Sequence, residues 1–271
     1  ELPLLYPKRR STRATGSAEV PLSGLTIGAS GGTPSLSASF IGQQSSSTTC
    51  SYFGPGCNPP DQALAASNDF VLQGVNTQWK VTSPTGAVQP GWPVSAQRFF
   101  GVPTVTKADG KPCDVTHANQ PFLSDPRAIY DRADHRFWAA MLQVENGLGI
   151  APDCPFKSVY YIAVSQTSDP RGAWNVYEFD MAAGSTYAAD YTQISVTDNA
   201  VLFSANMFNT AGPGFYAEVF EANKHQMENG QAKFTADGFR NLQGTGPGTT
   251  DRTGPFLADT VHPVQSSGEH G

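Results

Sequence analysis

Three aspartates recur at nearly equal intervals along the chain: Asp61, Asp125 and Asp190 lie 64 and 65 residues apart. Carboxylate oxygens that converge from several strands are ligands that Ca²⁺ prefers, and they also accept hydrogen bonds from sugar hydroxyls. The spacing therefore predicts a metal-binding or ligand-binding site built from one aspartate of each repeat. The alternative is that each aspartate caps a turn or accepts backbone N–H groups within its own repeat.

Amide side chains and one arginine accompany these aspartates. Asn76 and Asn206 follow the first and third aspartates by 15 and 16 residues, and Gln143 has a similar place in the middle repeat. If a second strand returns antiparallel to the first, these amides end beside the carboxylates and add oxygen ligands. Arg127 follows Asp125 by two residues, and its planar guanidinium suits either an anionic ligand or an ion pair with a neighbouring aspartate.

Aromatic rings offer flat faces that suit either sugar rings or a packed core. Trp92 is the tryptophan outside any clear strand-like run, so we predict a surface or ligand-binding role for it. The polar group from Asp131 to Arg136 is expected to be a solvated hairpin turn. Core packing is the competing explanation for the aromatic residues within strand-like runs, which are Trp79, Trp138, Trp174, Tyr160 and Tyr161.

Several classes of catalytic site are not indicated. The chain has no Gly-x-Ser-x-Gly elbow, phosphate-binding loop, dinucleotide fingerprint or Cys-x-x-Cys-His haem motif. Glycoside hydrolysis needs two carboxyl groups about 5–9.5 Å apart. The three aspartates could supply such a pair, but spacing along the chain does not fix that distance.

Composition favours a turn-rich, all-β protein. The chain has 27 Gly and 21 Pro among 271 residues, and 15% of its residues are charged, against about 25% in an average domain. This excludes a coiled coil or a helical bundle. The net charge of −6 excludes general nucleic-acid binding, which relies on Lys and Arg. No run of 18 apolar residues occurs, so no membrane span is expected.

The repeat itself predicts a β-propeller. In each repeat the aspartate precedes a short apolar run, a polar turn and a second apolar run, as in PDQALAASNDFVLQGVN, SDPRAIYDRADHRFWAAMLQ and ADYTQISVTDNAVLFSAN. Third runs follow as QWKVTS, SVYYIAVS and GFYAEVF, and a fourth, AWNVYEFD, is clear only in the middle repeat. Four short antiparallel strands every ~65 residues are typical of propeller blades. A β-sandwich is the alternative, and the segment from Lys224 to Gly230 is the single expected helix.

Three such repeats are too few for a closed ring, which needs at least four blades. We therefore predict a polar N-terminal arm over residues 1–57 and about three blades over residues 58–271. The incomplete ring indicates a partner, either another protein chain or the remainder of the same propeller.

Four cysteines favour an oxidising compartment and two local disulfides. Cys50 and Cys57 have six residues between them, and Cys113 and Cys154 have forty. We predict the pairs 50–57 and 113–154 among three possible connectivities. Since the chain begins at Glu1, it is interpreted as a mature or trimmed form of a secreted, extracellular or periplasmic protein.

The stretches SDPRAIYD-x3-HRFW, SVYYIAVSQTSDPRGAW and DY-x-QISV-x-DNAVLFSANMF resemble a family of secreted, largely uncharacterised β-propeller proteins. That family is allied in architecture to the sialidase and glycosidase propellers. The resemblance covers about residues 58–265 and implies a propeller fold. Within it, Ser168 to Trp174 resembles a degenerate Asp-box, a structural turn between the third and fourth strands of a blade.

These observations favour a non-catalytic binding or structural module in an extracellular or cell-surface assembly. The alternatives are a glycoside-active enzyme and a Ca²⁺-dependent glycan-binding protein, both of which would use the acidic mouth of the propeller. No cofactor is certain, and Ca²⁺ is the candidate ion.

Overall fold

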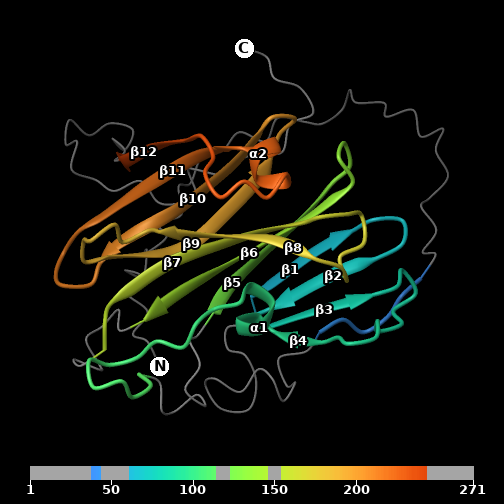
Figure 1. Cartoon of the computed structure of the whole chain (residues 1–271), viewed down its shortest axis with the longest axis horizontal. Helices are drawn as coiled ribbons and strands as arrows, with labels where there is room; N and C mark the ends of the chain where they lie inside the picture. Colours follow the sequence, from blue (N-terminus) through green and yellow to red (C-terminus); the bar gives the residue numbers. More distant parts are fainter. Residues whose placement is uncertain (1–37, 44–60, 114–122, 146–153, 243–271) are drawn as a thin grey trace, which may run out of the picture. The chain divides into compact units, whose positions relative to one another are not determined.

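The computed structural model describes residues 38–43, 61–113, 123–145 and 154–242, which belong to one compact unit beginning at Ala38. Their strands form three antiparallel sheets of four strands each (Figure 1). The first sheet consists of β1 (Gln62–Ala66), β2 (Val71–Val75), β3 (Gln78–Thr82) and β4 (Val94–Ser95). The second consists of β5 (Leu123–Asp131), β6 (Arg136–Glu145), β7 (Lys157–Ser165) and β8 (Trp174–Asp180). The third consists of β9 (Tyr187–Val196), β10 (Ala200–Asn209), β11 (Phe215–Asn223) and β12 (Ala236–Leu242).

The strand order within every sheet follows the chain, so each sheet is an antiparallel meander. The first strands of the three sheets contact one another in series, because β5 contacts both β1 and β9. These findings confirm the all-β class and the four-stranded repeat. No closed sheet is formed by the described residues.

Two hydrophobic cores lie on the two faces of the second sheet. Side chains alternate between the faces of a strand, and β6 and β7 are apolar on both. One face contributes Trp138 and Tyr160 to the core shared with the third sheet. The other contributes Phe137 and Tyr161 to the core shared with the first sheet. This alternation explains why these strands read as continuous apolar runs in the sequence.

The hairpin turns lie where the sequence placed them, but they are longer than two residues. Ser67 and Thr197 each accept hydrogen bonds from backbone N–H groups two and three residues later. Asp131 accepts one from Ala133 at 2.9 Å. A side-chain oxygen at the start of the loop therefore closes each of these turns. The Asp-box-like segment also lies at its expected place, between β7 and β8.

The expectation of a single helix was wrong. Besides α2 (Lys224–Glu228), the structure has α1 (Ala96–Phe100) directly after β4. Ser95 caps α1 by accepting a hydrogen bond from the Arg98 N–H at 3.3 Å, and Gly101 ends it with a φ of 67°. Ser followed by Gly six residues later is a local signal that could have predicted this helix. No helix in the described part of the chain is long and apolar enough to cross a membrane.

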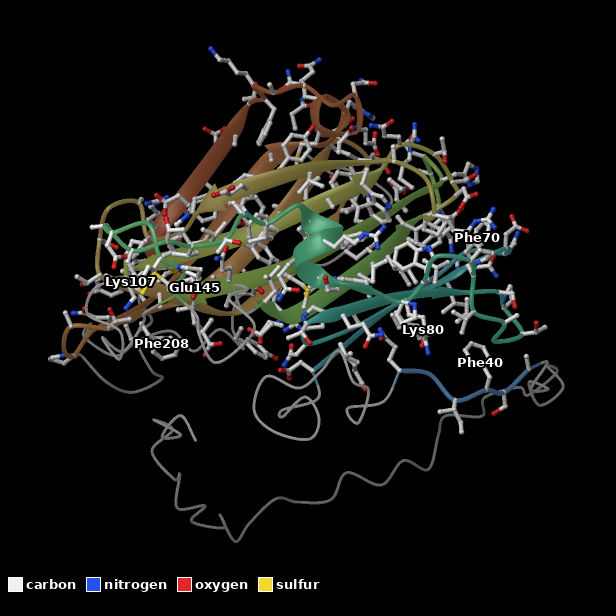
Figure 2. All side chains as sticks on the ribbon, turned by 60° about the horizontal axis from the view of Figure 1, so that its bottom comes forward. Phe40, Phe70, Lys80, Lys107, Glu145 and Phe208 are labelled. Carbon is white, nitrogen blue, oxygen red and sulfur yellow. A yellow bond between two sulfur atoms is a disulfide. The ribbon has the colours of Figure 1, made fainter. Side chains whose placement is uncertain are left out.

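Two further contacts lie at the ends of the described ranges. Cys113 and Cys154 form a disulfide, as predicted (Figure 2), whereas the predicted pair Cys50 and Cys57 lies outside the described residues. Phe40 lies beside the turn after β3 (Figure 2). Nearby, the Gln43 side chain donates a hydrogen bond to the Gln73 carbonyl at 2.8 Å, which holds residues 38–43 against the first sheet.

Candidate functional site

The three repeated aspartates come from the first strands of the three sheets and act on one another electrostatically. Asp61 immediately precedes β1, Asp125 lies in β5 and Asp190 lies in β9. All three are partly buried. The charges of Asp61 and Asp190 both raise the pKa of Asp125. We call this group, together with Arg127 and Tyr191, the aspartate centre.

Asp125 and Asp190 do not occupy equivalent positions in their strands. Each strand contains a β-bulge, and the bulge residue with positive φ is Asp125 in β5 (54°) but Tyr191 in β9 (50°). Asp190 lies one position earlier and pairs with Asn206 on β10. Bulges redirect side chains at strand ends. The two carboxylates therefore reach a common region from different backbone positions.

Asn76 links the first and second sheets at the aspartate centre. Its side-chain N–H donates to Asp61 Oδ2 at 2.9 Å, and its Oδ1 accepts the backbone N–H of Asp125 at 2.9 Å. Its Oδ1 already has a donor, so Asn76 holds two aspartates in place rather than offering a free oxygen ligand.

Burial is the main cause of the raised pKa values in the centre. For Asp125, burial and the two neighbouring carboxylates outweigh the attraction of Arg127 and a hydrogen bond from the Tyr191 N–H, so its pKa rises to about 6. Burial also raises the pKa of Asp190, against the same N–H group, which donates to Asp190 Oδ1 at 2.8 Å. A single backbone N–H thus serves both carboxylates.

Arg127 and Tyr191 give the centre a cation and an exposed ring. The Arg127 guanidinium carbon lies 5.7 Å from the centroid of the Tyr191 ring, and the Tyr191 side chain is 36% exposed. Burial raises the pKa of the nearby Tyr160 hydroxyl, which also contacts Thr192. Tyr191 was not predicted as a site residue, although it directly follows Asp190.

The two remaining amides differ in position. Asn206 faces Asp190 across the β9–β10 pair, is 7% exposed, and its Oδ1 has no hydrogen-bond partner among the described residues. Gln143 lies elsewhere, because it accepts a hydrogen bond from the Tyr161 hydroxyl at 2.9 Å in the core between the first two sheets.

Trp92 does not join the aspartate centre. It lines a separate hollow together with Trp174, between α1 and β8. Its ring centroid is 6.1 Å from that of Phe99.

A second group of charged residues surrounds the buried ammonium of Lys224, at the start of α2. Lys224 Nζ lies 2.5 Å from Asp131 Oδ2 and 2.5 Å from Asp134 Oδ2, in the β5–β6 turn. Burial lowers the pKa of Lys224, but the two carboxylates reverse this and raise it overall. This ion pair connects the second and third sheets. The sequence did not indicate it, because Lys224 lies in a short polar stretch.

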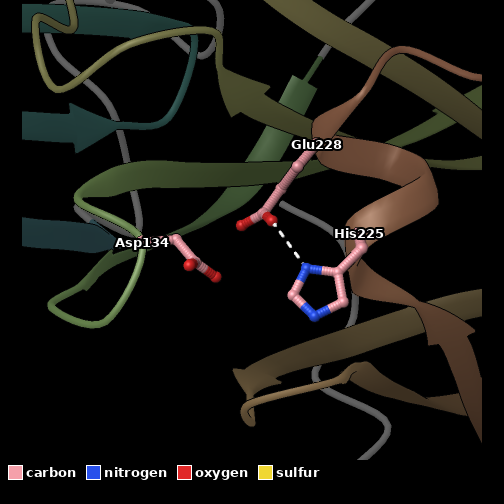
Figure 3. A group of neighbouring side chains, drawn as sticks. All are labelled: Asp134, His225 and Glu228. Atoms are coloured by element: carbon pink, nitrogen blue, oxygen red, sulfur yellow. Dashed lines mark hydrogen bonds and ion pairs between the residues drawn. The ribbon is translucent and has the colours of Figure 1, made fainter.

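Figure 3 shows the metal-ligating atoms that converge most closely in the described residues: those of Asp134, His225 and Glu228, all within 4.8 Å. His225 Nδ1 is 3.3 Å from Glu228 Oε2. The Lys224 ammonium lies beside the Asp134 and Glu228 carboxylates and partly offsets their negative charge. The three aspartates of the centre do not converge as closely.

The comparisons with protein-family models, curated proteins and solved structures found no match to this chain.

Proposed function

We propose that this protein is a non-catalytic carbohydrate-binding module of an extracellular assembly, and that its aspartate centre holds the hydroxyl groups of a sugar. One observation carries the proposal: three aspartates from three sheets influence one another at a partly exposed position. Carboxylates accept hydrogen bonds from hydroxyls, Arg127 donates them, and the exposed ring of Tyr191 offers a face for stacking.

The centre is better suited to a sugar than to a dedicated metal cage. The metal-ligand group found among the described residues consists of Asp134, His225 and Glu228 and includes none of the three aspartates, which favours a ligand other than a bare ion. Asn206, which faces Asp190 across the β9–β10 pair, places an amide beside the centre.

We further propose that the three sheets are blades of a β-propeller whose ring is completed by another chain or by further blades of the same protein. The contacts in series of β1, β5 and β9 support this arrangement. The disulfide between Cys113 and Cys154 is compatible with an exported protein. Light scattering after size exclusion tests assembly: a mass above 28.8 kDa is expected, and a strict monomer would contradict completion by another chain.

The binding test uses a panel of neutral oligosaccharides and isothermal titration calorimetry. At least one oligosaccharide should bind the wild-type protein, and Asp190→Asn should weaken that binding by about tenfold or more, since each tenfold corresponds to about 1.4 kcal/mol. Asp198→Asn, in the exposed β9–β10 turn, is the matched control and should bind normally. Equal binding by both variants would overturn the assignment of the site.

Glycoside hydrolysis is a second candidate function, favoured by the pKa of about 6 at Asp125. A carboxyl group with such a pKa, beside a second carboxylate, suits a general acid. Incubation with the oligosaccharides that bind should then release reducing sugar, and Asp125→Asn should abolish release while retaining binding. If the protein binds an oligosaccharide but releases no reducing sugar from it, the result contradicts hydrolysis and supports the non-catalytic function.

A further inference from the structure

Two hollows lie on either side of β8, the edge strand of the second sheet. The first has a volume of about 260 Å³ and lies between α1 and β8. We call it the aromatic hollow, because Trp92, Phe99 and Trp174 line it together with Arg98. None of these residues belongs to the aspartate centre.

The aromatic walls of this hollow are held in place by the core behind them. The Phe99 ring centroid lies 4.9 Å from that of Trp174 and 5.5 Å from that of the fully buried Trp79. The Trp174 indole N–H donates to the Pro170 carbonyl at 2.9 Å. The rings are therefore preorganised, and a ligand that stacks on them pays little to order them.

Among the described residues, the lining of the hollow has a positive charge and no negative one. Arg98 is its only charged lining residue, and the side chain makes no ion pair with any residue in the described ranges. The protein as a whole is acidic, with a net charge of −6, whereas the charge at this hollow is positive. Its charge complements an anion, and its planar guanidinium matches a carboxylate.

We infer that the aromatic hollow binds a single ring that carries a carboxylate, and specifically an acidic sugar unit of the uronate type. A volume of about 260 Å³ lies just below the ~300–1,000 Å³ of ordinary ligand pockets, which fits one ring rather than a chain. The apolar face of the sugar stacks on the tryptophans, while its carboxylate pairs with Arg98.

The test uses sodium glucuronate as the probe and tryptophan fluorescence as the readout. Trp79 and Trp138 are fully buried, whereas Trp92 and Trp174 line the hollow, so a bound ligand changes the emission of the accessible pair. We expect a saturable change with glucuronate and about tenfold weaker binding of glucose, since the Arg98 pair is then lost. Binding should also weaken as salt is added.

Arg98→Gln is the decisive variant, because Arg98 is exposed and its loss should not affect folding. It should weaken glucuronate binding by about tenfold. Arg132→Gln, an equally exposed arginine in the β5–β6 turn, is the matched control and should bind as the wild type does. Absence of a saturable signal, or equal binding by Arg98→Gln and the wild type, would overturn the inference.

Two further binding measurements distinguish an acidic sugar from other ligands and the aromatic hollow from the aspartate centre. Benzoate carries the same charge on an aromatic ring, and tighter binding of benzoate than of glucuronate would overturn the assignment to a sugar. Asp190→Asn should leave glucuronate binding unchanged. The inference therefore stands or falls independently of the sugar site proposed at the aspartate centre.

Discussion

Replacement of Glu218 by Gln should remove a large part of the pH dependence of stability. Glu218 lies in β11 with its side chain fully buried, and neither carboxylate oxygen has a hydrogen-bond partner among the described residues. The Arg240 guanidinium nitrogen Nε is 3.7 Å from Oε2. Burial, which Arg240 only partly offsets, raises the pKa of Glu218 from 4.5 to about 7.

The sign and size of the effect follow from these two pKa values. Below pH 4.5 both the folded and the unfolded protein hold the proton, so Glu218 contributes no pH dependence. Between pH 4.5 and about 7 only the folded protein keeps it, and the free energy of unfolding falls as the pH rises. The complete loss, reached above pH 7, is about 3 kcal/mol at ~1.36 kcal/mol per pH unit.

Urea unfolding of the wild type and Glu218→Gln at pH 4.5 to 8 measures this difference. Gln cannot titrate, so the variant should gain about 3 kcal/mol relative to the wild type across this range. Asp125 titrates in both proteins and cancels from the comparison. Glu221 is exposed on the same strand. The free energy of unfolding of Glu221→Gln should therefore vary with pH in the same way as that of the wild type. Parallel curves for Glu218→Gln and the wild type would refute the reasoning.

Three other substitutions or additions test the remaining contacts. Asn76→Ala should lower the free energy of unfolding by about 2 kcal/mol, because it leaves the Asp61 carboxylate and the Asp125 N–H without the Asn76 side chain as a partner. Urea unfolding measures the loss, and an unchanged free energy of unfolding would contradict the link between the first and second sheets. Lys224→Met should lower the free energy of unfolding by about 3–5 kcal/mol, since it leaves the buried Asp131 carboxylate uncompensated. A neutral or stabilising effect in urea unfolding would contradict the role of the ion pair. Added Ca²⁺ should change the melting temperatures of the wild type and of Asp61→Asn equally, because the centre is proposed to bind a sugar and not an ion. Calorimetry with and without chelator measures both changes, and a rise confined to the wild type would contradict this expectation in favour of the Ca²⁺ site that the sequence predicts.

The spacing of the aspartates could predict their meeting because it depends on strand order alone. Each repeat begins with a strand, and consecutive first strands contact one another. Asp61 directly precedes β1, and Asp125 and Asp190 lie in the first halves of β5 and β9, so the contacts between these strands bring the three residues near one another. The fourth strands were harder to predict: β4 has two residues, and β12 contains Asp237 and Gly238, which strands disfavour.

The sequence could not predict groups whose meaning depends on tertiary contacts. Lys224 lies in a polar stretch that is typical of a solvated surface, yet it is buried against Asp131 and Asp134 of another sheet. Glu218 is the one charged residue in the run Phe215–Phe220, yet its side chain is fully buried. In both cases the oppositely charged partner is distant in the sequence, so no local sequence pattern indicates the buried ion pair.

The bulges explain why the aspartate centre is unequal despite its regular spacing. A bulge adds one residue to a strand, so a constant interval in sequence does not give the same position in each sheet. Asp61 is held by the Asn76 amide and Asp190 by the Tyr191 N–H, while Asp125 receives the charge of both neighbours and has a pKa of about 6. Asp125 therefore changes from a hydrogen-bond donor to an acceptor as the pH passes about 6. A site of this kind can distinguish the hydroxyls of a ligand by position, which three equivalent carboxylates could not do.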